Sequence, residues 1–391
     1  MSKNGRLLTG GLVGAAVLTL SACGGSGSSN ATAGSSSGGS SSGGTITVAL
    51  VQPYSGAEAY YGKYENDAWT LAEQKYGSSV DGHAIKLIRA DSKCDPATAV
   101  SAVRQVLAQN PTVINASDCS GDTLAMLPIT TAKKVPMVSE NLAPNITTTG
   151  SHYIWRVQVS DAATNKYFGQ YVASKGYKAL GIIHDTTSYG TANAQTLVDG
   201  LKSSGVTPTV EASYDSSATD YSGQILKLKN ANVDAAYIEG YDLQEGNLVK
   251  QARSLGLTAP IYGPTTASDS TFIKAAGSAA NGMQFATSFI PDWNQAASSF
   301  SQEWDSKFGY EPNMDSVGMY EAAVTTIKAL QAAGGSTSPT KVNSAFAGLK
   351  LTGLPEGSVS FTSSGDLAQP TVLVGTWDNG ATKLVKVLTQ P

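Results

Sequence analysis

The chain has 391 residues, with 26 Lys and Arg against 30 Asp and Glu, and its formal net charge at pH 7 is −4. This mildly acidic composition, without a dense basic patch, argues against a nucleic acid as the partner. The length is sufficient for two lobes with separate hydrophobic cores.

The chain begins with the features of an export signal, residues 1–22. Lys3 and Arg6 precede an uncharged stretch, residues 7–20, which is short of the ~18 to 20 residues that a membrane-spanning helix needs. The four residues that end at Cys23, Leu-Ser-Ala-Cys, resemble the bacterial lipobox. The resemblance implies that Cys23 becomes the mature N-terminus, carries lipid and anchors the protein to the outer face of a membrane. A chance cysteine behind an ordinary signal is the alternative.

A linker of low complexity follows at residues 23–44. After Cys23 it consists almost entirely of Gly, Ser, Ala and Thr, which bury little and favour a flexible tether. Two segments of this linker match the hydrolase pattern G-x-S-x-G, but neither lies between a predicted strand and a predicted helix, so we assign them no catalytic role. No later stretch is apolar and long enough to span a bilayer.

Beyond the linker, short β-rich runs alternate with longer stretches of helical period. In the first half of the chain we expect strands at 45–51, 85–90, 112–116 and 136–139, and helices at 62–76, 95–109 and 121–133, the last interrupted near Pro128. The pattern then restarts, with helices expected at 161–174, 190–203, 221–229 and 243–255, and strands at 179–184, 209–214, 235–239 and 261–262. After an extended segment at 282–289 come helices at 296–308, 316–332 and 339–349, and strands at 359–361, 371–377 and 383–388. The repeated βα units indicate the α/β class, with two Rossmann-like lobes whose parallel sheets are flanked by helices.

Two cysteines remain after Cys23. In an oxidising compartment an even pair predicts a disulfide between Cys94 and Cys119, which stabilises the fold by ~3 kcal/mol in the loop-entropy view. A metal site would need further ligands, but the three histidines are scattered and no CxxC or HExxH motif occurs. No nucleophile with a plausible base and no phosphate loop is present either, so we expect neither a cofactor nor an enzyme.

Polar and aromatic residues gather where strands lead into helices, which is where open α/β sheets bind ligands. Residues 115–123 combine hydroxyls with a glycine at such a junction and suit an anion, although helix capping is the alternative and Asp118 and Asp122 would repel a negative charge. Tyrosines recur at similar junctions and suit an amphipathic small molecule, unless they only pack on the surface: Tyr54, Tyr60, Tyr61, Tyr189 and Tyr241.

Several short motifs carry a family resemblance. They include Tyr54-Ser55-Gly56, Tyr61-Gly62, Cys94-Asp95-Pro96, Cys119-Ser120, Tyr189-Gly190, the segment from Gln251 to Leu257, and Tyr262-Gly263-Pro264. With these motifs the sequence resembles the type I periplasmic binding proteins of the branched-chain amino acid family, which serve ABC importers. The resemblance implies two lobes joined by three hinge crossings near Arg156, Ala286 and Pro370. The N-terminal lobe would comprise 45–156 plus 287–370, and the C-terminal lobe 157–286 plus 371–391.

The resemblance also assigns roles by position. It implies that Tyr61 packs on the ligand, that Ser120 holds a carboxylate, that Tyr189 and Tyr241 reach in from the second lobe, and that Cys94 and Cys119 form the family's disulfide. Asn141 and Thr265 complete the predicted ligand-binding set at two departures from the family.

The first departure is Thr265, which stands where amino-acid binders carry a Glu that pairs with the ligand's ammonium. The second is the segment 139–143, which is one residue shorter than the family's loop and lacks its threonine contact. Since a buried ammonium needs an acceptor anion, an α-amino acid ligand would require Glu140, Glu239 or Asp242 in place of the missing Glu. Amides, ureas, and aromatic or aliphatic acids are the other expected ligands.

The leading hypothesis is therefore a lipid-anchored, extracytoplasmic solute-binding protein of an ABC importer, monomeric, with a permease as its protein partner. A sensor that uses the same closing lobes to report to a membrane receptor or kinase is the alternative.

Overall fold

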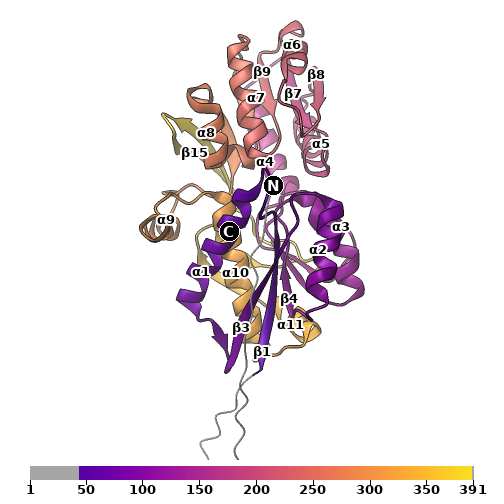
Figure 1. Ribbon diagram of the computed structural model, residues 1–391. Helices are drawn as coiled ribbons and strands as arrows, with labels where there is room; N and C mark the ends of the chain where they lie inside the picture. Colours follow the sequence, from indigo (N-terminus) through magenta and orange to yellow (C-terminus); the bar gives the residue numbers. More distant parts are fainter. Residues whose placement is uncertain (1–43, 390–391) are drawn as a thin grey trace, which may run out of the picture. The chain divides into compact units, whose positions relative to one another are not determined.

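The computed structural model describes residues 44–389 (Figure 1). The predicted signal, the predicted lipidation site Cys23 and the predicted linker up to residue 43 lie outside the described residues. Within 44–389, no helix has both the length and the apolar character needed to cross a membrane.

A six-stranded sheet in the order β2-β3-β1-β4-β5-β6 forms the centre of what we call the first lobe. Its strands are β1 Thr45–Gln52, β2 Ser79–Val80, β3 His83–Asp91, β4 Val113–Asn115, β5 Met137–Ser139 and β6 Ile154–Arg156. All pairings are parallel except that of the short edge strand β2. The residues of β1 from Val48 onward are buried on both faces, as expected for a strand with helices on either side.

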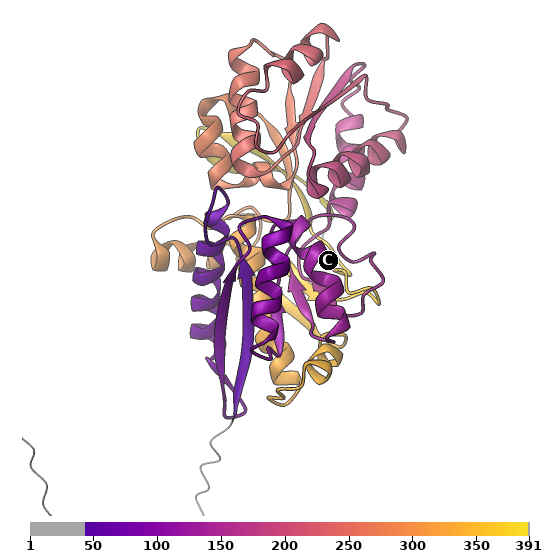
Figure 2. The ribbon, with the colours of Figure 1, turned by 45° about the vertical axis from the view of Figure 1, so that its right-hand side comes forward.

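The helices of the first lobe come from two separate parts of the chain. They are α1 Ala59–Tyr76, α2 Pro96–Leu107 and α3 Ser120–Ala132, and later α9 Gln295–Phe308, α10 Met314–Ala332 and α11 Pro339–Phe346. Figures 1 and 2 show α10 lying along α1, although more than 200 residues separate them in sequence. A hairpin of β12 Lys350–Leu354 and β13 Gly357–Ser360 follows α11.

A seven-stranded sheet in the order β15-β14-β11-β10-β9-β7-β8 forms the centre of the second lobe. Its strands are β7 Leu180–Asp185, β8 Val210–Tyr214, β9 Ala235–Ile238, β10 Ile261–Gly263, β11 Gln284–Thr287, β14 Val372–Asp378 and β15 Ala381–Thr389. The helices are α4 Asp161–Ala173, α5 Ser188–Lys202, α6 Ser222–Asn230, α7 Asp242–Ser254 and α8 Ser270–Ala276, with 3₁₀ turns η1 Thr265–Ser268 and η2 Gly277–Ala280. The strands pair in parallel from β8 to β11, whereas β14 and β15 add antiparallel strands at one edge.

Local sequence signals explain most of the element boundaries. Asp95 accepts a hydrogen bond from the Thr98 N–H at 2.7 Å and caps α2, and Pro96 occupies the first helical position, where its missing N–H has no effect. Ser160 caps α4 in the same way, through the Ala163 N–H at 3.3 Å.

Helix α3 runs through Pro128 without a break, so the predicted interruption is wrong. Proline removes one backbone hydrogen bond and crowds the preceding turn, which destabilises an isolated helix. Here Met126, Leu127 and Thr130 are buried, and α3 packs on α2 and β5. This packing keeps the helix continuous across the proline.

Three chain crossings connect the two sheets, after β6, after β11 and before β14. Glu356, which is 6% exposed, contacts all three of them. Its Oε1 accepts from Gln158 Nε2 and from Ser288 Oγ, both at 3.0 Å, and its carbonyl oxygen accepts from Thr371 Oγ1 at 2.7 Å. Its own N–H donates to Oε1 of buried Glu321 on α10 at 2.9 Å. One buried residue therefore contacts all three segments that cross between the two sheets.

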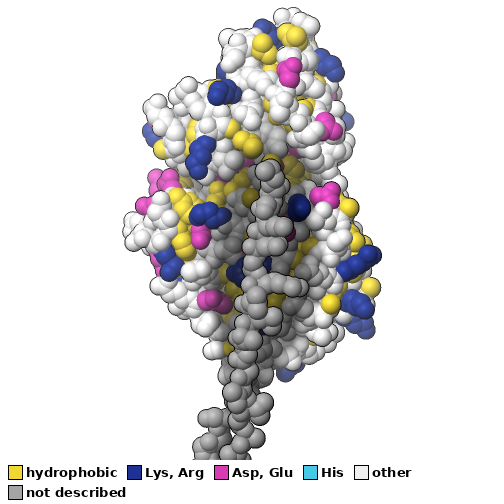
Figure 3. Space-filling model, viewed as in Figure 1, with side chains coloured by type: hydrophobic (Ala, Val, Ile, Leu, Met, Phe, Trp, Pro, Cys, Tyr) yellow, Lys and Arg dark blue, Asp and Glu magenta, His cyan; other side chains and the backbone are white. Residues whose placement is uncertain are grey.

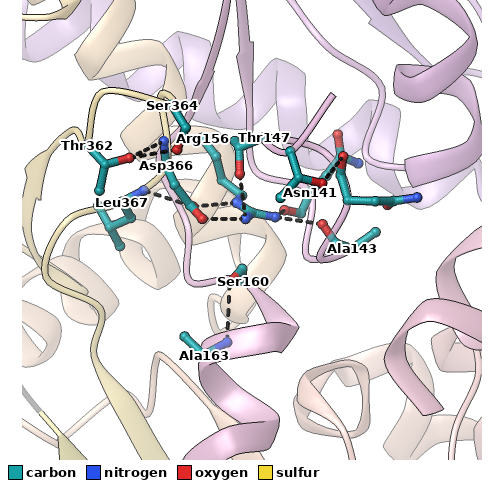
Figure 4. A network of polar contacts seen from close by, with 12 residues as sticks. Asn141, Ala143, Thr147, Arg156, Ser160, Ala163, Thr362, Ser364, Asp366 and Leu367 are labelled. Atoms are coloured by element: carbon teal, nitrogen blue, oxygen red, sulfur yellow. Dashed lines mark hydrogen bonds and ion pairs between the residues drawn. The ribbon is translucent and has the colours of Figure 1, made fainter. Parts of the chain in front are cut away.

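A second polar network stands beside the first crossing (Figure 4). The guanidinium of Arg156, 1% exposed, donates through Nε and Nη2 to the two carboxylate oxygens of Asp366, each at 2.8 Å. It also donates to the Ala143 carbonyl at 2.7 Å, to the Asn141 carbonyl at 3.4 Å and to Thr147 Oγ1 at 3.1 Å. The network joins the end of β6 to two loops, and every donor is directed at an oxygen, which is what a buried charge requires.

Candidate ligand-binding cleft

The carboxyl ends of the two sheets face each other across a narrow cavity of about 10 Å³. The lining residues come from both lobes: Tyr61, Asp118, Ser120, Leu142 and Asp315 from the first, and Tyr189, Tyr241 and Thr266 from the second. This is the position at which parallel α/β sheets place ligands, because the loops and helix N-termini that follow the strands converge there.

The structure brings four of the six predicted ligand-binding residues together in this lining: Tyr61, Ser120, Tyr189 and Tyr241. Asn141 lies beside the cavity, not in its lining, and donates through Nδ2 to the Ser117 carbonyl at 2.9 Å and to the Asp118 carbonyl. Its contacts hold the loop that carries Asp118.

Thr265 also lies outside the lining, with its hydroxyl 3.3 Å from a carboxylate oxygen of Asp161. The next residue, Thr266, lines the cavity, and its hydroxyl donates to the Gly240 carbonyl and to Glu245 Oε2, both at 2.9 Å. The lining residue is therefore Thr266, one residue after the predicted Thr265, and it presents a short hydroxyl side chain to the cavity.

The tyrosines lie in two neighbouring pairs. The ring centroids of Tyr60 and Tyr61 are 4.4 Å apart, and those of Tyr189 and Tyr241 are 5.4 Å apart. Burial, and for Tyr60 and Tyr61 also the nearby Asp242, raises the pKa of these phenols well above their usual value, so the hydroxyls stay protonated and act as donors.

Hydrogen bonds run directly from one lobe to the other around the cavity. The hydroxyls of Tyr60 and Tyr61 on α1 donate to Asp242 Oδ2 at the start of α7, at 2.7 and 3.0 Å. The hydroxyls of Tyr64 and Ser270 are 3.2 Å apart. The lobes are thus in contact, and the cleft between them is closed along α1.

Carboxylates dominate the electrostatics of the cleft. Burial, together with the charges of Glu65, Asp269 and Glu58, raises the pKa of Asp118 to about 8. Burial and the neighbouring Asp242 raise the pKa of Asp315 well above its usual range. Both groups would be more stable with a compensating positive charge nearby.

Three of these acids form one cluster across the two lobes. Oxygen atoms of Asp242, Asp269 and Asp315 lie within 4.8 Å of one another, a spacing that a single cation could bridge. Asp315 belongs to α10 of the first lobe, whereas Asp242 begins α7 and Asp269 caps α8 in the second. Asp315 was not among the residues predicted from the sequence, because an acid in the first turn of a helix is also common as a simple helix-stabilising residue.

A wider groove of about 560 Å³ lies outside the cavity and is lined by both lobes, including Tyr241, which lines the cavity as well. Cys94 and Cys119 form a disulfide at the wall of this groove, with their Cα atoms 5.4 Å apart. The disulfide joins the loop before α2 to the start of α3 and so fixes one side of the entrance.

Charged side chains on the surface are dispersed. On the face drawn in Figure 3, Lys and Arg side chains are scattered over the molecule, with Asp and Glu side chains interspersed. The scattered distribution offers no broad basic footprint on that face.

Comparisons with known proteins match nearly all of the described chain. The family model described as "Periplasmic binding protein" matches residues 45–382. A leucine-, isoleucine-, valine-, threonine-, and alanine-binding protein of Pseudomonas aeruginosa is 26% identical over 348 residues, which cover 87% of this chain and 91% of that protein.

Solved structures show the same architecture. A leucine-binding protein from Thermotoga maritima superposes with a TM-score of 0.82 at 24% identity, covering 89% of this chain and 99% of that one. A solute-binding protein of an ABC transporter from R. palustris, solved in complex with benzoate, gives a TM-score of 0.83 at 17% identity, covering 88% and 97%. At these identities the structural likeness establishes the fold alone.

Proposed function

Because the chain belongs to the periplasmic binding protein family, in its type I branched-chain amino acid branch, we propose that it is the solute-binding protein of an ABC importer. The family consists of solute-binding proteins that act outside the cytoplasm and not of enzymes. One observation carries the proposal: a closed cavity between two lobes, lined from both sides by tyrosines, hydroxyls and carboxylates.

Ligand capture would use hinge motion. We propose that the three crossings tied together by Glu356 form the hinge, with 45–156 plus 287–370 as one moving body and 157–286 plus 371–391 as the other. An entering solute would contact lining residues of both lobes and thereby stabilise the closed form over the open one. The cross-lobe hydrogen bonds from Tyr60 and Tyr61 to Asp242 would further stabilise that closed form.

The finer assignments rest on sequence. The Leu-Ser-Ala-Cys segment supports lipidation at Cys23, which would hold the binding protein close to its permease on the outer face of the membrane. The relative from Pseudomonas aeruginosa is named for the amino acids that it binds, which supports an amino-acid-like or related organic solute.

Gene deletion tests the proposal. Solutes that raise the unfolding temperature of the purified protein identify candidates, and uptake of the strongest one is then compared in wild-type, deletion and complemented cells. Loss of uptake on deletion and its return on complementation are expected. Normal uptake in a strain without a redundant binder would refute the importer assignment, and a lost signalling response in that strain would favour the sensor.

A further inference from the structure

Two carboxylates from separate elements face the same cavity. Asp118 lies in the loop between β4 and α3, and Asp315 in the first turn of α10. Asp315 is 3% exposed, and its Oδ2 has no hydrogen-bond partner. An unpartnered carboxylate oxygen in a buried position is costly unless a cation or a proton satisfies it.

Two further acids, Asp242 and Asp269, add to the buried carboxyl groups that lack a positively charged partner among the described residues. Asp242 is also buried and has an unpartnered Oδ1, although its Oδ2 accepts from two tyrosines. Asp269 accepts from Asn313 Nδ2, which leaves its negative charge in place. Within residues 44–389, none of the ion pairs formed by Lys, Arg or His involves Asp118, Asp242, Asp269 or Asp315.

The rest of the lining suits an organic cation better than a bare metal ion. Tyr61, Tyr189 and Tyr241 surround the cavity, and aromatic rings attract organic cations through their faces. Leu142 adds an apolar contact.

From these observations we propose that the cleft binds a small organic cation, with its positively charged nitrogen between Asp118 and Asp315, and that it disfavours ligands that also carry a carboxylate. The inference rests on the proposed function and defines the ligand class for it. A carboxylate on the ligand would add negative charge to a small cavity where burial and mutual repulsion already raise the pKa of Asp118, Asp242 and Asp315. No Lys, Arg or His occurs among the described residues that line the cavity to offset that repulsion.

The test uses three probes with similar hydrocarbon chains: isoamylamine, which has only the amine; 4-methylpentanoate, which has only the carboxylate; and leucine, which has both. Choline and agmatine extend the cationic set, and isovaleramide supplies a neutral one. Binding to the purified full chain is measured by titration calorimetry and by the shift in unfolding temperature. The cations are expected to bind. Leucine and 4-methylpentanoate are expected to bind at least ~10-fold more weakly, so that their association constants are one tenth of that of the best cation or less.

Two variants test the carboxylates directly. Asp118→Asn and Asp315→Asn keep the side-chain shape and remove the charge, so each should weaken binding of the best cation by ~10-fold or more. Asp305→Asn, which changes an exposed acid on α9, is the matched control and should leave affinity unchanged. Asp315→Asn should also raise the unfolding temperature of the ligand-free protein, which separates a loss of binding from a loss of folding.

Each other result has a distinct meaning. Binding of a neutral or anionic probe that both variants leave intact would overturn the cation proposal but not the binding function. Stabilisation by CaCl₂ alone, removed by EDTA and by Asp315→Asn, would overturn it in favour of a metal ion in the acidic cluster. Failure of every probe to bind would overturn this inference. The importer assignment is tested separately, by uptake in the deletion strain.

Discussion

Glu356→Gln tests the buried carboxyl that contacts all three crossings. The substitution keeps an oxygen that can accept from Gln158 and Ser288, at 3.0 Å each in the wild type, and it keeps the backbone contact to Thr371. Only the ability to carry a negative charge is lost. Burial raises the pKa of Glu356 from 4.5 to about 7, and Glu321 is its buried acidic neighbour.

Because burial raises the pKa of Glu356, the free energy of unfolding depends on pH. Between the unfolded and folded pKa values the native state binds more protons than the unfolded state, so stability falls as pH rises through this window. One pKa unit corresponds to about 1.4 kcal/mol, so a rise from 4.5 to about 7 costs the wild type roughly 3 kcal/mol by the top of the window. The Gln variant has no such group and does not lose this amount.

Urea unfolding of wild type and Glu356→Gln at several values between pH 4.5 and pH 8 measures the effect, with Asp305→Asn as a control at an exposed site. We expect the difference in unfolding free energy to move in favour of the Gln variant by about 3 kcal/mol across that range. A difference that stays constant with pH, or that moves against the variant, would refute the reasoning about this buried carboxyl.

Three further changes address other parts of the structure. Arg156→Met leaves Asp366, which is 28% exposed, without its buried partner, and should lower the unfolding free energy by about 3 kcal/mol in urea, the lower end for a broken buried pair; a loss below 1 kcal/mol would contradict the network's role. Replacing Cys94 and Cys119 together by Ser opens a loop with a sequence separation of 25 and should cost about 3 kcal/mol, whereas an unchanged denaturation midpoint would show that the disulfide adds no stability. Tyr60→Phe removes the hydroxyl that lies 2.7 Å from Asp242 Oδ2 in the other lobe and 2.6 Å from Glu58 Oε2 in its own, and should weaken ligand binding by roughly 10-fold through the closed form, with no more than a small change in urea stability; equal affinity would exclude this hydroxyl from closure.

Much of the fold could be predicted from sequence because hydrophobic patterning and capping are local signals. Asp95 and Pro96 indicated the start of α2, and the structure begins that helix at Pro96. The seven-residue helix α8 was missed because it is too short for a periodic pattern, and β12 because three of its five residues are exposed. The continuity of α3 through Pro128 depends on packing against other elements, which no local rule contains.

The cleft shows the same division between local and long-range information. Tyr61, Ser120, Tyr189 and Tyr241 could be placed because each follows or begins an element at the carboxyl end of a sheet. Asp315 could not, since its place in the cavity depends on α10, almost 200 residues after β4 in sequence, packing back into the first lobe.

The measurement that tests the central claim most directly is small-angle X-ray scattering of residues 45–389, with and without a saturating concentration of the probe that binds most tightly. If the two lobes close on the solute about the three crossings, the radius of gyration falls on binding. An unchanged radius of gyration at full saturation would contradict hinge closure and the capture mechanism that depends on it.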